Sequence, residues 1–109
     1  MTFYYYSEAK EAEPVPGVKR RMAACGDRVQ IIEYFLPKGT VFPLNRLSSE
    51  QISYIVRGRL RVTIKEKESI LSSGDGYLVP SNVEHGAVAL EDSVVIDVFS
   101  PPIEEQKED

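Results

Sequence analysis

The sequence has almost none of the residues that cross-link or anchor many extracellular proteins. It contains one cysteine, Cys25, so no disulfide can form within the chain. No apolar run approaches the roughly twenty residues that cross a bilayer, and the first ten residues, MTFYYYSEAK, lack the basic and apolar regions of a signal peptide. These absences predict a cytoplasmic protein with no membrane partner. Because Cys25 has no local histidine or second cysteine, we expect it to be an inert small residue near a turn.

Concentrated positive charge is also missing. The 109 residues carry a net charge of −4, and the basic residues are scattered, so the sequence predicts no nucleic-acid partner. The densest basic cluster is Lys19-Arg20-Arg21, which we expect to be either a strand edge or a partner for carboxylates of the same chain. With 42% hydrophobic and 28% charged residues, the chain has the composition of one soluble globular domain.

No segment has a convincing helical pattern. Short runs of alternating or β-branched residues are separated by turn residues about every eight to twelve positions, which predicts roughly eight to ten strands in an all-β antiparallel sandwich or barrel. Residues 1–17 are expected to form a first strand, or an arm packed on a second subunit, followed by a loop. Residues 18–102 then form the barrel, and residues 103–109 a polar, solvated tail. Strands are expected at 18–25, 29–36, 51–56, 59–65, 69–71, 77–79, 86–90 and 93–99, with a hairpin turn at 66–68.

Two stretches of the chain carry a family resemblance. GTVFPLNRLSSEQISYIVRG at residues 39–58 and GDGYLVPSNVEH at residues 74–85 resemble the two halves of the cupin signature. Further matches to the small pectin-degradation cupins, the sugar-isomerising kind, are GVKR (17–20), PSNVEHG (80–86) and IDVFSPPI (96–103). The resemblance covers residues 18–102 without gaps. It implies a jelly-roll barrel (a double-stranded β-helix) with a site in its mouth, and usually a homodimer.

The same resemblance locates four metal positions, and here most of them lack a good ligand. Metal-binding cupins carry H-x-H-x(3)-E/Q and one later histidine, and the matching residues are Asn45, Leu47, Gln51 and His85. Because the first three are all odd-numbered, we expect them to face the barrel interior together. Imidazole is a strong donor, an amide oxygen is weak and leucine has none. We therefore expect no metal cofactor, with a divalent zinc, nickel or manganese ion as the lesser alternative.

His85 and Asp97 are the candidate catalytic residues. His85 is the only histidine, and it is either a hydrogen-bonded packing residue or a general acid or base. Asp97 interrupts an apolar strand, where an unpaired carboxylate would be costly. It either pairs with Arg20 or Arg21, or it lines the pocket beside Phe99 as a base.

The remaining interior positions are apolar. Leu47, Ile55, Leu60, Val62 and Ile64 are expected to face inward. They either fill a core or line a pocket for a small apolar or aromatic molecule, with Asn45, Gln51, Ser53 and His85 as its polar contacts.

The arginine that the resemblance predicts for gripping a sugar-acid carboxylate is Ile103 here. Arg46 and Arg57 are the candidate substitutes, although strand periodicity points Arg46 away from the interior. Three hypotheses follow. We favour a small-molecule-binding protein, whose ligand is a sugar acid or a small apolar or aromatic compound. The alternatives are an unsaturated-uronate isomerase that uses His85 and Asp97, and a dimeric structural module.

Overall fold

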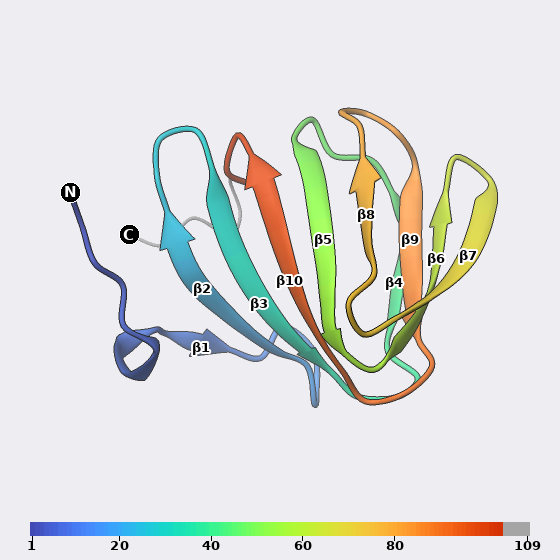
Figure 1. The fold of residues 1–109 in the computed structure, drawn as a ribbon, viewed down its shortest axis with the longest axis horizontal. Helices are drawn as coiled ribbons and strands as arrows, with labels where there is room; N and C mark the ends of the chain where they lie inside the picture. The colour runs from blue at the N-terminus through green and yellow to red at the C-terminus, as the bar shows by residue number, and fades with distance from the viewer. Residues whose placement is uncertain (104–109) are drawn as a thin grey trace.

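The structure is a computed structural model that describes residues 1–103, and it is almost entirely β. One short 3-10 helix, η1, precedes ten strands (Figure 1). The elements are η1 (Tyr6–Glu8), β1 (Glu11–Ala12), β2 (Lys19–Cys25), β3 (Gln30–Leu36), β4 (Val41–Asn45), β5 (Glu50–Arg57), β6 (Arg59–Ile64), β7 (Lys67–Ser72), β8 (Gly76–Val79), β9 (His85–Ala89) and β10 (Ser93–Ser100). The described residues contain no helix long and apolar enough to cross a membrane.

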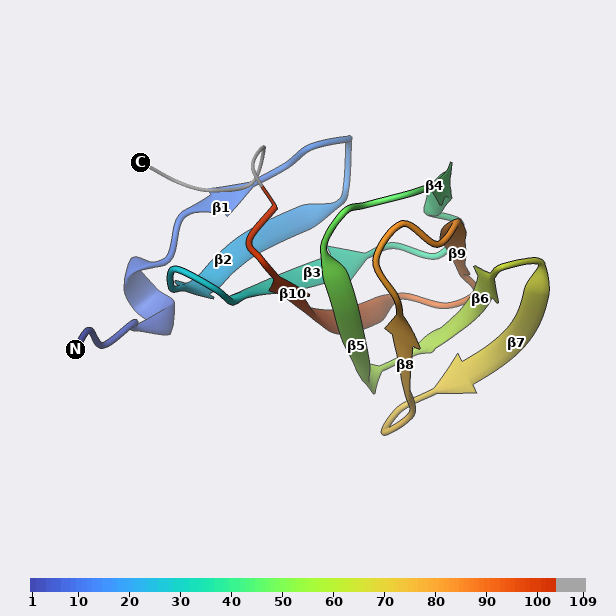
Figure 2. The same cartoon turned by 90° about the horizontal axis from the view of Figure 1, so that it is seen from above.

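The strands form two antiparallel sheets that pack into a jelly roll. The large sheet has the order β1-β2-β3-β10-β5-β8, and the small sheet has the order β4-β9-β6-β7. Figure 2 shows β1 and β2 projecting on the side away from the small sheet, so the barrel proper is enclosed by the other strands. Neighbours such as β10 and β3 are far apart in sequence, as jelly-roll topology requires. The predicted all-β jelly roll is confirmed.

Period-two alternation explains most of the strands. In β6, Leu60 and Val62 are buried and face the other sheet, as predicted. In β10, the buried positions are the odd-numbered ones from Ser93 to Phe99. In β3, the even-numbered residues are buried, while Ile31 is 37% exposed. The buried side chains of the two sheets therefore meet in one core between them.

The hairpin between β6 and β7 is tighter than predicted. The expected turn at residues 66–68 is instead a two-residue turn made by Lys65 and Glu66, between the paired residues Ile64 and Lys67. Both turn residues have positive φ, 49° and 70°, which matches the right-handed twist of the flanking strands. The side-chain pattern gave no sign of this, because neither residue is a glycine or an asparagine.

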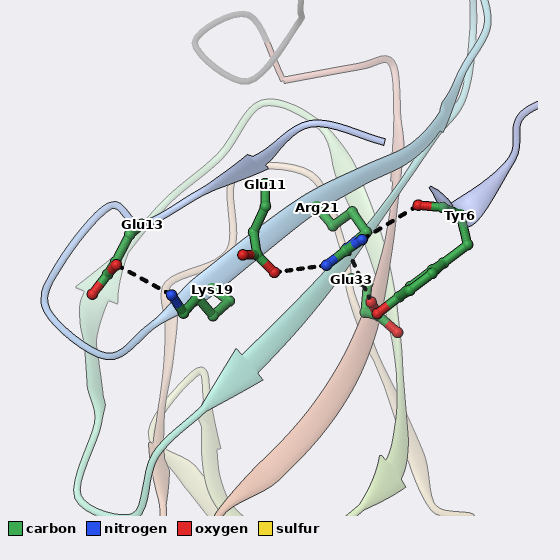
Figure 3. Close-up of polar contacts among 6 residues, drawn as sticks. All are labelled: Tyr6, Glu11, Glu13, Lys19, Arg21 and Glu33. Carbon is green, nitrogen blue, oxygen red and sulfur yellow. Dashed lines mark hydrogen bonds and ion pairs between the residues drawn. The ribbon is translucent and has the colours of Figure 1, made fainter. Parts of the chain in front are cut away.

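The N-terminal segment forms the 3-10 helix η1 and the short strand β1, and residues 1–5 do not form the first strand that was one of the two expectations; the other, an arm packed on a second subunit, stays a prediction. Arg21 in β2 explains this arrangement (Figure 3). Its guanidinium lies 4.1 Å from the centre of the Tyr6 ring and forms a 2.6 Å ion pair with Glu11. Lys19 in β2 pairs with Glu13 at 3.3 Å. The expectation that this basic cluster pairs with carboxylates of the same chain is confirmed for Lys19 and Arg21.

Strand β4 was not among the strands predicted from the sequence. Pro43 lies within it and cannot donate a ladder hydrogen bond. The pairing with β9 accordingly shifts between Phe42 and Asn45, which pair with Ala87 and His85. Three steps along β4 therefore match two along β9, as in a β-bulge.

The first residue of the predicted solvated tail is part of the core. Ile103 is buried, and its backbone N–H donates a 2.8 Å hydrogen bond to Oε1 of buried Gln30. Just before it, the Ser49 hydroxyl donates to the carbonyl of Pro101 at 2.6 Å. Residues 101–103 are thereby held against the barrel, and Ile103 is not solvated as expected. The other tail positions lie outside the described residues.

Candidate functional site

The barrel encloses a cavity of about 230 Å³ between the two sheets. It reaches the surface, because its lining includes the exposed residues Pro43 and Asn45 of β4. Most of its wall is apolar. Eight of the residues named as candidates from the sequence line it together: Asn45, Leu47, Gln51, Leu60, His85, Asp97, Phe99 and Ile103.

These residues come from more elements than the sequence argument assumed. Asn45 ends β4 in the small sheet, Gln51 lies in β5 of the large sheet, and Leu47 lies in the connection between them. Their shared odd numbering therefore does not place them on one strand face. They meet because both sheets turn their inner faces toward the same cavity, and Leu47 packs against the core beneath it.

A cross-strand row of polar side chains lies on the inner face of the large sheet. Asp97 in β10 and Tyr77 in β8 are the strand partners of Ser53 in β5, one on each side. The Ser53 hydroxyl donates a 2.6 Å hydrogen bond to Oδ1 of Asp97, and it accepts a 2.9 Å bond from Nε2 of Gln51. Ser53 was expected to contact a ligand. Instead it is 1% exposed, does not line the cavity, and orients Gln51 and Asp97, which do.

The Asp97 carboxyl has an unusual environment. Burial raises its pKa to about 6, and the hydrogen bond from Ser53 only partly offsets that rise. The predicted ion pair with Arg20 or Arg21 is wrong: Arg21 pairs with Glu11 and Glu33 on the outer side of the barrel. Within residues 1–103, the hydroxyl of Ser53 takes the place of the expected cation.

Tyr77 is the residue of this site that sequence reasoning missed. It lines the cavity, and burial raises the pKa of its phenol, as does the nearby Asp97 charge, whereas Ser53 lowers it. A signal was present, since Tyr77 alternates with exposed Gly76 and Leu78 and shares its face with buried Val79. The strand was predicted, but its register against β5 was not.

His85 begins β9 and lies beside Asn45 and Ile64, its partners in β4 and β6. Its Nδ1 lies 3.0 Å from the carbonyl oxygen of Val83. Because a carbonyl only accepts, Nδ1 carries the proton in this contact. Nε2 forms no hydrogen bond with residues 1–103, so it remains available to a ligand in the cavity. His85 thus makes the hydrogen bond expected of a packing residue through Nδ1, and its Nε2 forms no hydrogen bond with residues 1–103.

The donor set at the four family positions does not suit a divalent cation. His85 supplies one imidazole, Asn45 and Gln51 supply amide oxygens, and Leu47 supplies no donor. Gln51 is also held by its hydrogen bond to Ser53. The described part of the chain has no group of three His, Cys, Asp or Glu side chains placed to hold a metal ion.

The apolar residues predicted to face inward divide between core and cavity. Leu47 and Leu60 line the cavity, whereas Ile55 and Val62 fill the core beyond it. Ile64 is partly buried against that core.

Aromatic and terminal residues complete the wall. Tyr34 and Phe42 meet edge to face there, with ring centres 5.6 Å apart. Ile103 also lines the cavity, at the position where the resemblance predicts an arginine. Neither candidate substitute reaches it: Arg46 donates to the Asn82 carbonyl at 3.0 Å, and Arg57 lines a separate hollow on the outer face.

Comparison with known proteins agrees with this architecture. Residues 32–99 match the family described as Cupin domain (Cupin_2). The chain is 36% identical over 87 residues to the pectin degradation protein KdgF of Dickeya dadantii, covering 78% of this chain and 79% of that protein.

Two solved structures are similar over nearly their whole length. KdgF from a Halomonas species superposes with a TM-score of 0.92 at 31% identity, covering 98% of this chain and 99% of that one. An RmlC-like cupin from Shewanella frigidimarina gives a TM-score of 0.91 at 28% identity, covering 96% of this chain and 95% of the other.

Proposed function

Since the chain belongs to the cupin domain family and its barrel encloses a cavity that reaches the surface, we propose that it binds a small molecule there without a metal ion. The observation that carries this proposal is the combination of apolar walls with a few convergent polar groups, which is typical of ligand sites. Those groups are Asn45, Gln51, His85 and Asp97.

A thermal-shift panel of sugar acids and small aromatic compounds tests the proposal. We expect at least one class to raise the melting temperature by several degrees, because a ligand that binds only the folded state stabilises it. Leu47→Trp, which fills the cavity, should abolish the shift. Leu78→Trp adds the same ring at an exposed position of β8 and should leave it intact. A panel without any shift would contradict a small-molecule site.

The absence of a metal is tested separately. We expect metal-stripped protein supplied with zinc, nickel or manganese to retain none of them stoichiometrically, because His85 is the one strong donor at the four family positions. Elemental analysis after desalting measures this. A tight site with one ion per chain would refute the metal-free proposal.

A second candidate is an enzyme that isomerises unsaturated uronates, as the resemblance to pectin-degradation cupins implies. The observation in its favour is that Asp97 and His85 line one cavity, with the pKa of Asp97 raised to about 6, where a carboxyl can exchange a proton near neutral pH. Against it stands Ile103, which replaces the arginine. Proton NMR can follow the ring opening of an unsaturated uronate with and without the protein. A rate equal to that in buffer would refute the enzyme candidate.

The third candidate is an interaction module, and the outer face of the large sheet favours it. Ile31, Val98, Ile52 and Leu78 are direct cross-strand partners in β3, β10, β5 and β8, and they form an apolar row. Ile52 is 54% exposed and Leu78 is 50% exposed. A contiguous apolar patch of this kind on an outer face is typical of an interface.

A second copy of the chain is the partner that we infer for this face. Along β5 the exposed residues run from Glu50 at one end, through apolar Ile52, to Arg57 at the other. A two-fold axis across the strands would place Glu50 of each copy near Arg57 of its partner, so the charges are self-complementary. Ile52→Asp should convert a dimer to monomer in sedimentation equilibrium. Ile70→Asp, at a 53% exposed position of β7, should not, and a monomeric unsubstituted chain would refute the inference.

A further inference from the structure

The charge of the cavity indicates which ligands it can accept. Within the described residues, its lining includes one carboxylate, Asp97, and no lysine or arginine. The two arginines within the first motif point elsewhere, Arg46 to the Asn82 carbonyl and Arg57 to the outer face. A bound carboxylate would therefore lie near Asp97 with no cation from residues 1–103 in the lining to offset their repulsion.

One oxygen of Asp97 is free to meet a ligand. The residue is 9% exposed, and its Oδ1 accepts the hydrogen bond from Ser53. Its Oδ2 has no hydrogen-bond partner among residues 1–103. Every fully buried side-chain polar atom described has a partner, so Oδ2 is not fully buried and must contact the cavity space. An almost buried carboxylate with one unpartnered oxygen is a site for a donor, and a positively charged donor suits it best.

Aromatic rings surround the same space. Tyr34, Phe42, Tyr77 and Phe99 line the cavity, and they come from four different strands, β3, β4, β8 and β10. The face of an aromatic ring attracts a cation, and the ring also packs against apolar groups. The wall thus suits a ligand with a charged head and an apolar body.

The size of the cavity limits that body to one ring or a short chain. An apolar cavity of about 150 Å³ is enough to hold benzene. The 230 Å³ here therefore accommodates one ring together with a short polar arm.

We propose that the cavity binds a small protonated amine, with its ammonium group on Oδ2 of Asp97 and its apolar body against the aromatic wall. This inference rests on the proposed function, because it assigns the charge of the ligand for the same cavity. It departs from the sugar acid that the family resemblance suggests. The raised pKa of Asp97 supports it, since a bound ammonium would supply a counter-charge that residues 1–103 do not place there.

Three compounds that share one ring test the charge assignment: benzylamine, benzyl alcohol and benzoate. Isothermal titration at pH 7.5 should give the tightest binding for benzylamine, at least tenfold tighter than benzyl alcohol, and the weakest for benzoate. Asp97→Asn should weaken benzylamine at least tenfold while changing benzyl alcohol by less than about threefold. The control Asp27→Asn makes the same substitution at an exposed turn and should change neither affinity.

The outcomes separate this inference from the proposal beneath it. If benzyl alcohol or benzoate binds as tightly as benzylamine, the cavity is a ligand site but the amine assignment is wrong. If benzylamine binds equally well to the Asp97→Asn protein, and that protein unfolds cooperatively, Asp97 does not hold the ammonium group. If none of the three compounds binds, the amine assignment fails, and the panel of sugar acids and aromatics then decides whether the cavity is a site at all.

Discussion

Replacing the Asp97 carboxyl should make the protein more stable at neutral pH. Burial raises the pKa of this group from 3.8 to about 6, so the folded protein favours its protonated form. A raised carboxyl pKa contributes stability that is fully present below the unfolded pKa and is lost as the pH rises through the folded value. The window of loss therefore runs from about pH 4 to pH 6.

The size of the effect follows from that shift. A difference of about 2 pKa units corresponds to about 3 kcal/mol between the two protonation states. Asp97→Asn keeps an oxygen to accept the Ser53 hydrogen bond and removes the charge. We therefore expect the variant to be more stable than the unsubstituted protein by up to about 3 kcal/mol at pH 7.5, and by little at pH 4.

Urea unfolding at several pH values measures the difference. For a domain of this size, 3 kcal/mol also corresponds to a rise in melting temperature of about 10 °C. The control Asp27→Asn changes an exposed carboxyl and should follow the unsubstituted protein at every pH. Parallel curves for the Asp97→Asn and unsubstituted proteins from pH 4 to 8 would refute the reasoning, because they would show no cost for ionising Asp97 in the fold.

Three further predictions concern other features. Gly58→Ala should lower the free energy of unfolding in urea by about 3 kcal/mol or more, because a Cβ at φ +104° would lie 2.7 Å from a backbone carbonyl oxygen. The control Gly39→Ala places a Cβ that meets nothing within 4 Å, and it should lower the free energy of unfolding by about 1 kcal/mol. Gln30→Leu should cost about 1–3 kcal/mol, since it leaves the buried N–H of Ile103 without an acceptor, and a variant as stable as the parent would contradict that role. Benzylamine should bind about tenfold more weakly at pH 5 than at pH 7.5, because only about a tenth of the Asp97 carboxyl is ionised at pH 5. If calorimetry gives the same benzylamine affinity at both pH values, the ammonium group does not depend on ionised Asp97.

The sequence predicted the fold where side-chain alternation alone determines a strand. Leu60 and Val62 face inward because β6 has clear period-two alternation, and the family motifs supplied the jelly-roll topology. Strand β4 was missed because Pro43 and the register shift beside it interrupt any alternation. The two-residue turn at Lys65 and Glu66 was misplaced because its backbone geometry leaves no mark in residue type.

The sequence predicted which residues form most of the candidate site, but it did not predict which of them contact one another. Gln51 and Asp97 line the cavity as expected, but the hydroxyl between them belongs to Ser53, which was expected to touch the ligand. Such pairings depend on register between strands more than forty residues apart in the chain. Tyr77 was overlooked for the same reason. The burial of Ile103 was not predicted because the polar residues after it suggested a solvated tail.

The row formed by Asp97, Ser53 and Tyr77 also has a consequence for how the protein opens. Its three members lie on β10, β5 and β8, which are joined only by long-range pairing. No fragment of the chain holds this constellation alone, so a ligand on Asp97 can be retained only while all three strands remain paired. Binding should therefore slow amide hydrogen exchange across β5, β8 and β10 together, because openings that separate these strands dismantle the site that the ligand stabilises.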